Sequence, residues 1–235
     1  MIRVAVAGAA GRMGETVCTA VEDATDMELV GRADPLLDRT LGQVLREGKP
    51  EVVVDFTRPD AALENALECV RAGAHVVIGT TGFDVESLGE QARAIAAENP
   101  ESGRSNVFVA PNFAIGAVLM MRFAAEASMY MSKAEIVELH HDGKLDAPSG
   151  TAARTARLMA EASGAEEPPI HSVRLPGIVA NQEVILGDVG QTLTIRHDTT
   201  GRESFMPGVL LAIRGVRMLE SSPVVGLEHL LFRGQ

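Results

Sequence analysis

Short apolar runs alternate with longer amphipathic segments through the first half of the chain. Val, Ile and Ala dominate these runs, which predict buried strands at residues 3–7, 27–33, 51–56, 75–78 and 106–109. A helical pattern follows the glycine-rich residues 8–14 and runs to about residue 24, and further helical patterns follow at about residues 59–72 and 84–98. Strands that alternate with helices predict an α/β fold with a Rossmann-type, doubly wound parallel sheet and right-handed crossovers.

The pattern changes in the second half. A strand is predicted at 135–140, and helices at about 115–131, 149–163 and 208–219. After Pro168-Pro169, three short alternating runs predict an antiparallel meander at 171–175, 181–186 and 191–197. We therefore expect a second, α+β domain with a mostly antiparallel sheet. The expected divisions are a first domain over 1–112, a second over 113–205, and a C-terminal helix and tail over 206–235 that returns to the first domain.

Composition argues against several classes of protein. The net charge of −11 argues against nucleic acid or an anionic membrane as a partner. No apolar run reaches the roughly 18 residues of a membrane span, and a strand that starts at Met1 leaves no room for a signal peptide. Cys18 and Cys69 form neither a metal spacing nor a disulfide framework, so we expect a cytoplasmic protein without a metal site. The acidic, Arg-rich composition fits either a salt-adapted surface or a GC-rich genome.

A glycine-rich turn follows the first predicted strand. Gly8, Gly11 and Gly14 have the spacing GxxGxxG between a strand and a helix, which is the context of a dinucleotide fingerprint. These glycines would allow, in order, a tight turn, the approach of a pyrophosphate and close packing of the helix. The motif is weak on its own, because similar turns also occur without a ligand.

An acid ends the next predicted strand. Asp34 lies about 20 residues beyond the glycines, where a carboxylate accepts hydrogen bonds from the adenosine ribose. Asp before Pro also starts turns, and the two roles are compatible. Pro35 stands where an Arg could have met a 2′-phosphate, which favours NADH over NADPH. Three arginines could still supply positive charge to NADPH: Arg12, Arg32 and Arg39.

Two further strand ends extend the candidate cofactor site. The turns at 79–82 and 110–113 follow predicted strands, and parallel sheets bind ligands at the carboxyl ends of their strands. The first of these turns could be only a loop, but its position favours contact with a cofactor. The candidate cofactor-binding residues are Gly8, Ala9, Ala10, Gly11, Arg12, Met13, Asp34, Gly79, Thr80, Thr81, Ala110, Pro111, Asn112 and Phe113.

One short segment concentrates reactive side chains. It holds the adjacent His140 and His141 and also Lys144, one of three lysines in the sequence. Residues 149–151, Ser-Gly-Thr, predict the first turn of a helix, whose N–H groups make an anion site. The histidines could instead be two ordinary strand-end residues, and adjacent strand residues face opposite ways, which makes a poor metal site. The lysine and the helix start favour a site for an anionic substrate and a proton donor.

Two motifs resemble the 4-hydroxy-tetrahydrodipicolinate reductase (dihydrodipicolinate reductase) family, which acts in the diaminopimelate route to lysine. They are GAAGRMG at 8–14 and the pattern E-x-H-H-x-x-K-x-D-A-P-S-G-T-A at 138–152, and the resemblance extends over essentially the whole chain. The turns at 79–82 and 110–113 resemble the family's nicotinamide-side loops. The departures are Ala180, Gln182 and Gln191, where the family often has Gly, His and Glu.

The resemblance implies a homotetramer with an N-terminal Rossmann domain and a C-terminal domain for substrate binding and oligomerisation. It implies that NAD(P)H reduces a cyclic unsaturated dicarboxylate, made from pyruvate and aspartate semialdehyde, to tetrahydrodipicolinate and water. His140 matches the general acid, and the reference pKa of His, about 6.5, suits proton transfer. Lys144 matches a second cation that holds a carboxylate or assists protonation, and Asp146 is expected to be a structural anchor. The expected substrate-binding residues are His141, Ser149, Gly150 and Thr151.

Two alternatives stay open on the sequence. One is another Rossmann oxidoreductase that acts on aspartate or a semialdehyde, which would not need the His-His-Lys cluster. The other is a non-catalytic dinucleotide-sensing module, which would bind NADH without turnover and would usually present a basic or hydrophobic partner surface.

Overall fold

The computed structural model describes residues 1–98 and 105–232. It divides into two compact units. Unit 1 comprises Met1–Phe113 and Phe205–Gln235, and unit 2 comprises Ala114–Ser204. No helix in the described residues is long and apolar enough to cross a membrane.

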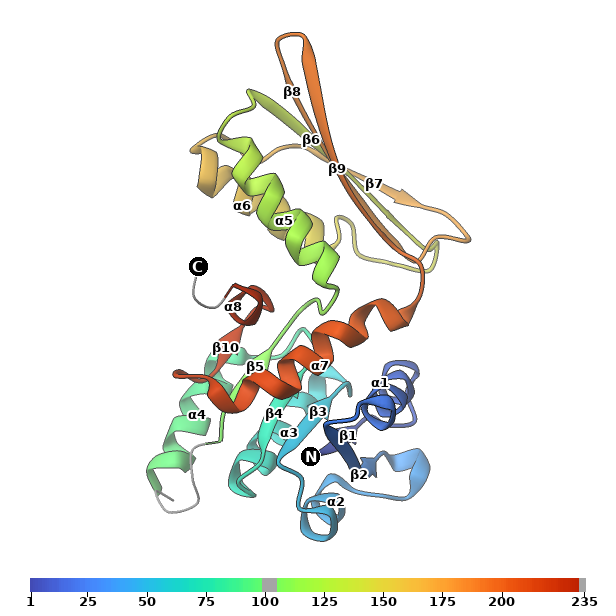
Figure 1. The fold of residues 1–235 in the computed structure, drawn as a ribbon, viewed down its shortest axis with the longest axis vertical. Coiled ribbons are helices and arrows are strands. Elements are labelled where there is room, and N and C mark those ends of the chain that lie inside the picture. The colour runs from blue at the N-terminus through green and yellow to red at the C-terminus, as the bar shows by residue number, and fades with distance from the viewer. Residues whose placement is uncertain (99–104, 233–235) are drawn as a thin grey trace. The chain divides into compact units, whose positions relative to one another are not determined.

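Unit 1 is built on a six-stranded parallel sheet with the strand order β10-β5-β4-β3-β1-β2 (Figure 1). The strands are β1 (Ile2–Ala7), β2 (Met27–Ala33), β3 (Val52–Asp55), β4 (His75–Ile78), β5 (Val107–Val109) and β10 (Val224–Val225). The predicted Rossmann-type sheet is therefore confirmed. The sequence did not predict β10, because a strand of two residues is too short to show a period.

Helices cover both faces of this sheet. On one face, α1 (Arg12–Asp23) packs against α7 (Met206–Gly215). On the other face lie α2 (Leu41–Gly48), α3 (Pro59–Arg71) and α4 (Val85–Glu98). The sequence analysis missed α2, although its start carries a capping box, in which the side chains and backbone N–H groups of Thr40 and Gln43 bond reciprocally.

The turn between β1 and α1 requires two of its glycines. Gly8 has a φ of 76°, and a Cβ there would lie 2.6 Å from the carbonyl oxygen of Phe56. A Cβ on Gly14 would lie 2.0 Å from the carbonyl oxygen of Gly8. The prediction that Gly14 lets the helix pack close to the strand is confirmed.

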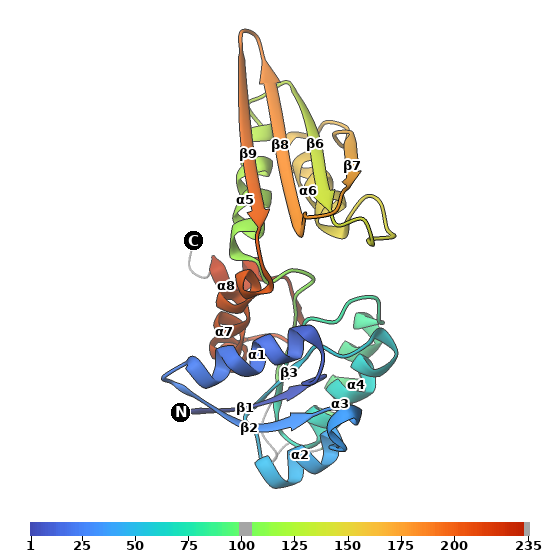
Figure 2. The same ribbon diagram turned by 90° about the vertical axis from the view of Figure 1, so that its right-hand side faces the viewer.

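Unit 2 contains a four-stranded sheet with the order β7-β6-β8-β9 (Figure 2). The strands are β6 (Lys133–His140), β7 (Ile170–Arg174), β8 (Ala180–Asp188) and β9 (Gln191–Thr199). β8 is antiparallel to both β6 and β9, so the mostly antiparallel sheet is confirmed. The predicted three-strand meander is wrong for β7, which pairs parallel with β6. A helix separates β6 from β7, and such a crossover connects parallel strands.

Helices α5 (Ile115–Ser128) and α6 (Gly150–Ser163) pack side by side and cover one face of this sheet. Ile136, Met159 and Leu186 are buried between the helices and the sheet. The predicted limits of α6 are confirmed, because the Ser149 hydroxyl accepts a hydrogen bond from the Ala152 N–H and the helix ends at Gly164, with a φ of 72°. α6 therefore begins directly after the loop that carries Lys144.

Candidate active site

The candidate cofactor turns of unit 1 lie at one edge of its sheet. The turns that begin at Gly8, Asp34, Gly79 and Ala110 follow β1, β2, β4 and β5, and parallel strands end at a common edge. Backbone hydrogen bonds join each turn to its neighbour: Gly8 N–H donates to Ala33 at 2.9 Å, Gly79 N–H to Asp55 at 2.9 Å, and Ala110 N–H to Ile78 at 3.0 Å. The structure thus gathers these predicted residues along one edge.

The Asp34 carboxylate joins the glycine-rich turn to the end of β2. Oδ2 accepts a hydrogen bond from the Ala10 N–H at 3.1 Å, and Oδ1 accepts one from the Leu36 N–H at 2.9 Å. The second bond caps the short helix η1 (Pro35–Leu37), so the expected turn role is present. Each carboxylate oxygen keeps capacity for another donor, which is compatible with the ribose role.

Asp55, at the end of β3, was not singled out from the sequence. Its side chain is 1% exposed. Oδ1 accepts from the Thr57 N–H at 2.9 Å, the Thr57 hydroxyl at 2.7 Å and the Thr80 hydroxyl at 3.2 Å, and Oδ2 accepts from Asn65 Nδ2 at 2.8 Å. This buried acid therefore holds three segments together, including the candidate turn at Thr80. The available signal was an acid that closes the otherwise apolar strand Val-Val-Val-Asp.

Aromatic packing surrounds the same strand ends. The rings of Phe56 and Phe113 lie 5.8 Å apart between centroids, and Phe113 also contacts Phe108 at 6.5 Å. The Phe113 side chain is 3% exposed, so it belongs to the core, and its backbone is the part that could meet a ligand. A Cβ on Gly79 would lie 2.1 Å from the Phe56 ring, which explains a glycine there.

The remaining unit 1 candidates differ in exposure. Gly11, Arg12, Thr81 and Pro111 are exposed, Ala10, Met13 and Asn112 are half-buried, and Ala9 is buried. The exposed and half-buried members can meet a ligand through side chain or backbone, whereas the buried Ala9 also packs within the turn.

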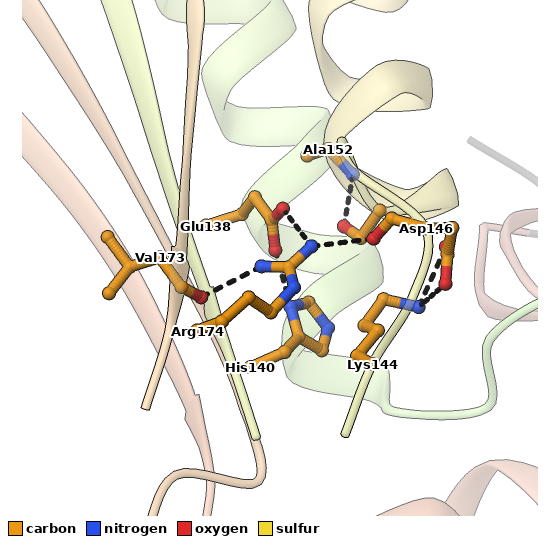
Figure 3. Close-up of polar contacts among 8 residues, drawn as sticks. Glu138, His140, Lys144, Asp146, Ala152, Val173 and Arg174 are labelled. Atoms are coloured by element: carbon orange, nitrogen blue, oxygen red, sulfur yellow. Dashed lines mark hydrogen bonds and ion pairs between the residues drawn. The ribbon is translucent and has the colours of Figure 1, made fainter. Parts of the chain in front are cut away.

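The candidate catalytic cluster of unit 2 lies where β6 and β7 end (Figure 3). His140 is the last residue of β6 and lies in register with Arg174, the last residue of β7. Glu138, two residues before His140, is fully buried. Its carboxylate contacts His140 Nδ1 and accepts a hydrogen bond from Arg174 Nη2 at 2.8 Å. Neither Glu138 nor Arg174 was proposed as a site residue from the sequence.

Lys144 lies on the loop after β6, and its side chain is 22% exposed. Its Nζ donates to both carboxylate oxygens of Asp146, at 2.7 and 2.8 Å, and its N–H donates to the His141 carbonyl at 3.1 Å. The Asp146 carbonyl in turn accepts from Arg174 at 2.7 Å. These bonds hold the loop against the ends of β6 and β7. The Asp146 carboxylate forms an ion pair with Lys144, the predicted cation.

The start of α6 lies beside this loop. Ser149 is buried, Gly150 is exposed and Thr151 is half-buried, whereas the His141 side chain is exposed. Gln182 Nε2 donates to the Thr155 hydroxyl at 2.8 Å, and this hydroxyl donates to the Thr151 carbonyl at 2.8 Å. Gln182, one of the departures from the family pattern, therefore supports the first turn of α6.

The charges around His140 act on its protonation in opposite directions. Burial lowers the pKa of His140 below its ordinary value, Lys144 and Arg174 lower it too, and Glu138 acts to raise it. Burial alone would raise the pKa of Glu138, but hydrogen bonds from Arg174, Ser172 and His140 outweigh burial and keep the pKa below its ordinary value. The cluster therefore combines an ionised carboxylate with a histidine that readily releases its proton.

No group of three or more His, Cys, Asp or Glu side chains suited to a metal ion occurs in residues 1–98 and 105–232. The reactive groups present are an acid–base histidine, a lysine and a helix N-terminus.

A dinucleotide-type parallel sheet and a second sheet that carries this histidine cluster define a two-domain NAD(P)H-dependent oxidoreductase. The family model for the N-terminus of dihydrodipicolinate reductase matches residues 2–113, and the model for its C-terminus matches residues 116–231. The chain belongs to the dihydrodipicolinate reductase family.

Named relatives support this assignment. The 4-hydroxy-tetrahydrodipicolinate reductase of Mycolicibacterium smegmatis is 47% identical over 250 residues, which covers 98% of this chain and 99% of the relative. That of Thermobifida fusca is 48% identical over 253 residues, with the same coverage. The solved dipicolinate-bound dihydrodipicolinate reductase of Paenisporosarcina sp. TG-14 is 39% identical, with a TM-score of 0.84 over 97% of this chain and 99% of that chain. The predicted family and fold class are confirmed.

Replacing Asp55 by Ala should destabilise unit 1 by about 1–3 kcal/mol, because the buried hydroxyl of Thr80 and the half-buried donors of Thr57 and Asn65 lose their acceptor. Urea unfolding followed by circular dichroism measures the change. Asp60→Ala is the matched control, because Asp60 forms an exposed ion pair with Arg58 at the start of α3. Equal losses in the two variants would contradict the assigned role of Asp55.

Proposed function

We propose that the protein reduces 4-hydroxy-tetrahydrodipicolinate to tetrahydrodipicolinate with NAD(P)H, in lysine and diaminopimelate biosynthesis. The observation that carries the proposal is the cluster of His140 and Lys144 beside the start of α6, in a chain of this family. One relative is described as dipicolinate-bound, which supports a planar dicarboxylate as the kind of ligand. Neither an aspartate-type substrate nor a sensing module gives a reason for this cluster.

The residues of unit 1 fit a dinucleotide. Gly8 and Gly14 allow the tight backbone packing of a dinucleotide-type turn, because a Cβ on either would clash with a carbonyl oxygen, and Asp34 offers carboxylate oxygens at the end of β2. The cofactor candidates from Gly8 to Met13, with Asp34, would hold the adenosine and pyrophosphate. The turns at 79–81 and 110–113 would hold the nicotinamide side. When bound, the cofactor supplies a hydride to the substrate.

The residues of unit 2 would supply the proton and the charge. Loss of the 4-hydroxyl group as water gives a conjugated imine. Hydride addition to C4 of this imine leaves an enamine-like anion, to which His140 donates a proton on the adjacent carbon. Lys144 would pair with one substrate carboxylate. To do so, its Nζ must leave the carboxylate of Asp146, with which it is paired in the structure. The start of α6, with Ser149, Gly150 and Thr151, would bind the other carboxylate, and His141 would contact the substrate.

Wild-type protein should oxidise NADH when the substrate is generated from pyruvate and aspartate semialdehyde. His140→Gln should lower kcat about 10²- to 10⁴-fold, because Gln cannot donate the proton. Absorbance at 340 nm follows the reaction.

His229→Gln is the control, since His229 is an exposed histidine of the short helix α8 (Glu228–Leu231) in unit 1. An inactive wild type would overturn the proposed reaction. Equal losses in the two variants would overturn the role of His140.

We propose a preference for NADH. The Asp34 carboxylate would repel a 2′-phosphate, and two nearby arginines are already paired, Arg39 with Glu47 and Arg32 with Glu22. The ratio of kcat/KM for the two cofactors should therefore favour NADH. A preference for NADPH above tenfold would contradict this proposal.

We propose that the protein is a homotetramer that associates through the sheet of unit 2. Opposite α5 and α6, this sheet carries four partly exposed apolar side chains, Val137, Leu139, Val173 and Ile185. Native mass spectrometry should give a species of four times the chain mass. The Ile185→Glu variant should instead give smaller assemblies, because association would bury the new carboxylate at the interface. A wild-type monomer at micromolar concentration would refute this assembly.

We propose that the protein acts in the cytoplasm. Cys18 and Cys69 are free thiols buried in α1 and α3, which suits a reducing compartment. Recovery of the native protein from an oxidising compartment would contradict this location.

A further inference from the structure

Glu138 is a fully buried carboxylate in the middle of the candidate catalytic cluster. An isolated carboxylate in such a place would take up a proton, since burial disfavours the charged form. Arg174 prevents this, because its guanidinium donates to Glu138 Oε1 at 2.8 Å and cannot lose its charge. Glu138 therefore stays ionised inside the protein.

Arg174 is itself held in place. Its Nη1 donates to the Val173 carbonyl at 2.8 Å, and its Nη2 donates to the Asp146 carbonyl at 2.7 Å (Figure 3). The guanidinium thus bridges β7, Glu138 and the loop that carries Lys144. Movement of Arg174 would break several hydrogen bonds at once, so the Glu138–Arg174 pair is a rigid support.

The ionised carboxylate decides which nitrogen of His140 carries a proton. Glu138 Oε2 contacts His140 Nδ1, and an ionised carboxylate can only accept a hydrogen bond. Nδ1 must therefore be the donor in this contact. Nε2 is then the nitrogen that gains and loses a proton.

We infer that Glu138, kept ionised by Arg174, is a positioning residue that holds His140 with Nδ1 protonated and makes Nε2 the proton-donating atom. This role rests on the proposed function, in which His140 protonates the reduced substrate. The sequence analysis left Glu138 without a role, although it opens the E-x-H-H motif.

The charges that face His140 make the pH dependence of activity sensitive to the charge of Glu138. Arg174 from β7 and Lys144 from the following loop oppose a charged imidazole, and β8 presents the uncharged Ala180 in register. Burial also lowers the pKa of His140, and Glu138 acts to raise it. A general acid works below its pKa, so loss of the Glu138 charge should move the fall in activity to lower pH.

Unit 1 carries a control outside the cluster and outside the sheet of unit 2. Glu64 on α3 pairs with Arg71 at 2.9 Å, and their side chains are 72% and 51% exposed. Solvent screens such a pair, so its carboxylate has little influence on a distant imidazole. A substitution of Glu64 therefore removes a glutamate without touching the cluster.

The first test is the pH profile of kcat. Glu138→Gln should shift the fall in kcat at high pH downward by about one unit or more and lower kcat at least about tenfold at pH 8. KM for NADH should stay the same, Glu138→Asp should restore part of the profile, and Glu64→Gln should match the wild type. An unshifted profile for Glu138→Gln with normal KM would overturn the inference.

The second test is nitrogen NMR of ¹⁵N-histidine-labelled protein, with His140 assigned through His140→Gln. Neutral wild-type His140 should carry its proton on Nδ1, and Glu138→Gln should reduce that population and lower the titration midpoint of His140. A wild-type His140 protonated on Nε2, with bare Nδ1, would overturn the inference. This measurement needs no turnover and uses wild type, so it decides the role of Glu138 even if the proposed reaction fails or a variant does not fold.

Discussion

The buried carboxylate of Glu138 is the constraint on which the candidate site depends. It must be matched by a cation, and Arg174 can reach it because β7 runs parallel to β6 and places Arg174 in register with His140, two residues beyond Glu138. That parallel pairing exists because α6 crosses between the strands. The same crossover brings the start of α6 to the loop of Lys144. One topological feature thus assembles the candidate acid, its support and the candidate anion site.

Unit 1 uses carboxylates in a similar way. Asp55 is buried and accepts hydrogen bonds from donors on three segments, and Asp34 joins the glycine-rich turn to the end of β2. In both cases a carboxylate accepts hydrogen bonds from loop residues, which lack the regular backbone hydrogen bonds of a helix or sheet. The candidate cofactor edge is therefore preorganised by side chains that lie beneath it, which is how a binding site keeps its geometry before a ligand arrives.

Much of the fold could be predicted from the sequence, because its signals are local. The βα alternation indicated the sheet of unit 1, and Ser149 and Gly164 marked the ends of α6. The orientation of β7 could not be predicted, because strand pairing depends on contacts distant in sequence. Helix α2 was overlooked despite the capping box at Thr40.

The candidate site could be predicted only in part. His140 and Lys144 stood out by residue type and spacing, and the family resemblance added expected roles. Glu138 did not stand out, because its partner Arg174 lies 36 residues away and is brought near by the parallel pairing. Asp55 was overlooked because its donors come from the segments of Thr57, Asn65 and Thr80. Side-chain networks of this kind require the tertiary structure.

On the proposed function, the protein combines a hydride from the cofactor with a proton delivered by its own acid. Turnover of the substrate with NADH doubly deuterated at C4 in water, and with ordinary NADH in D₂O, separates the two sources, and mass spectrometry and NMR locate the label in tetrahydrodipicolinate. One cofactor-derived deuterium is expected at C4 in the first experiment, and one solvent-derived deuterium is expected on the adjacent ring carbon in the second. A product without cofactor-derived deuterium would contradict the proposed hydride transfer.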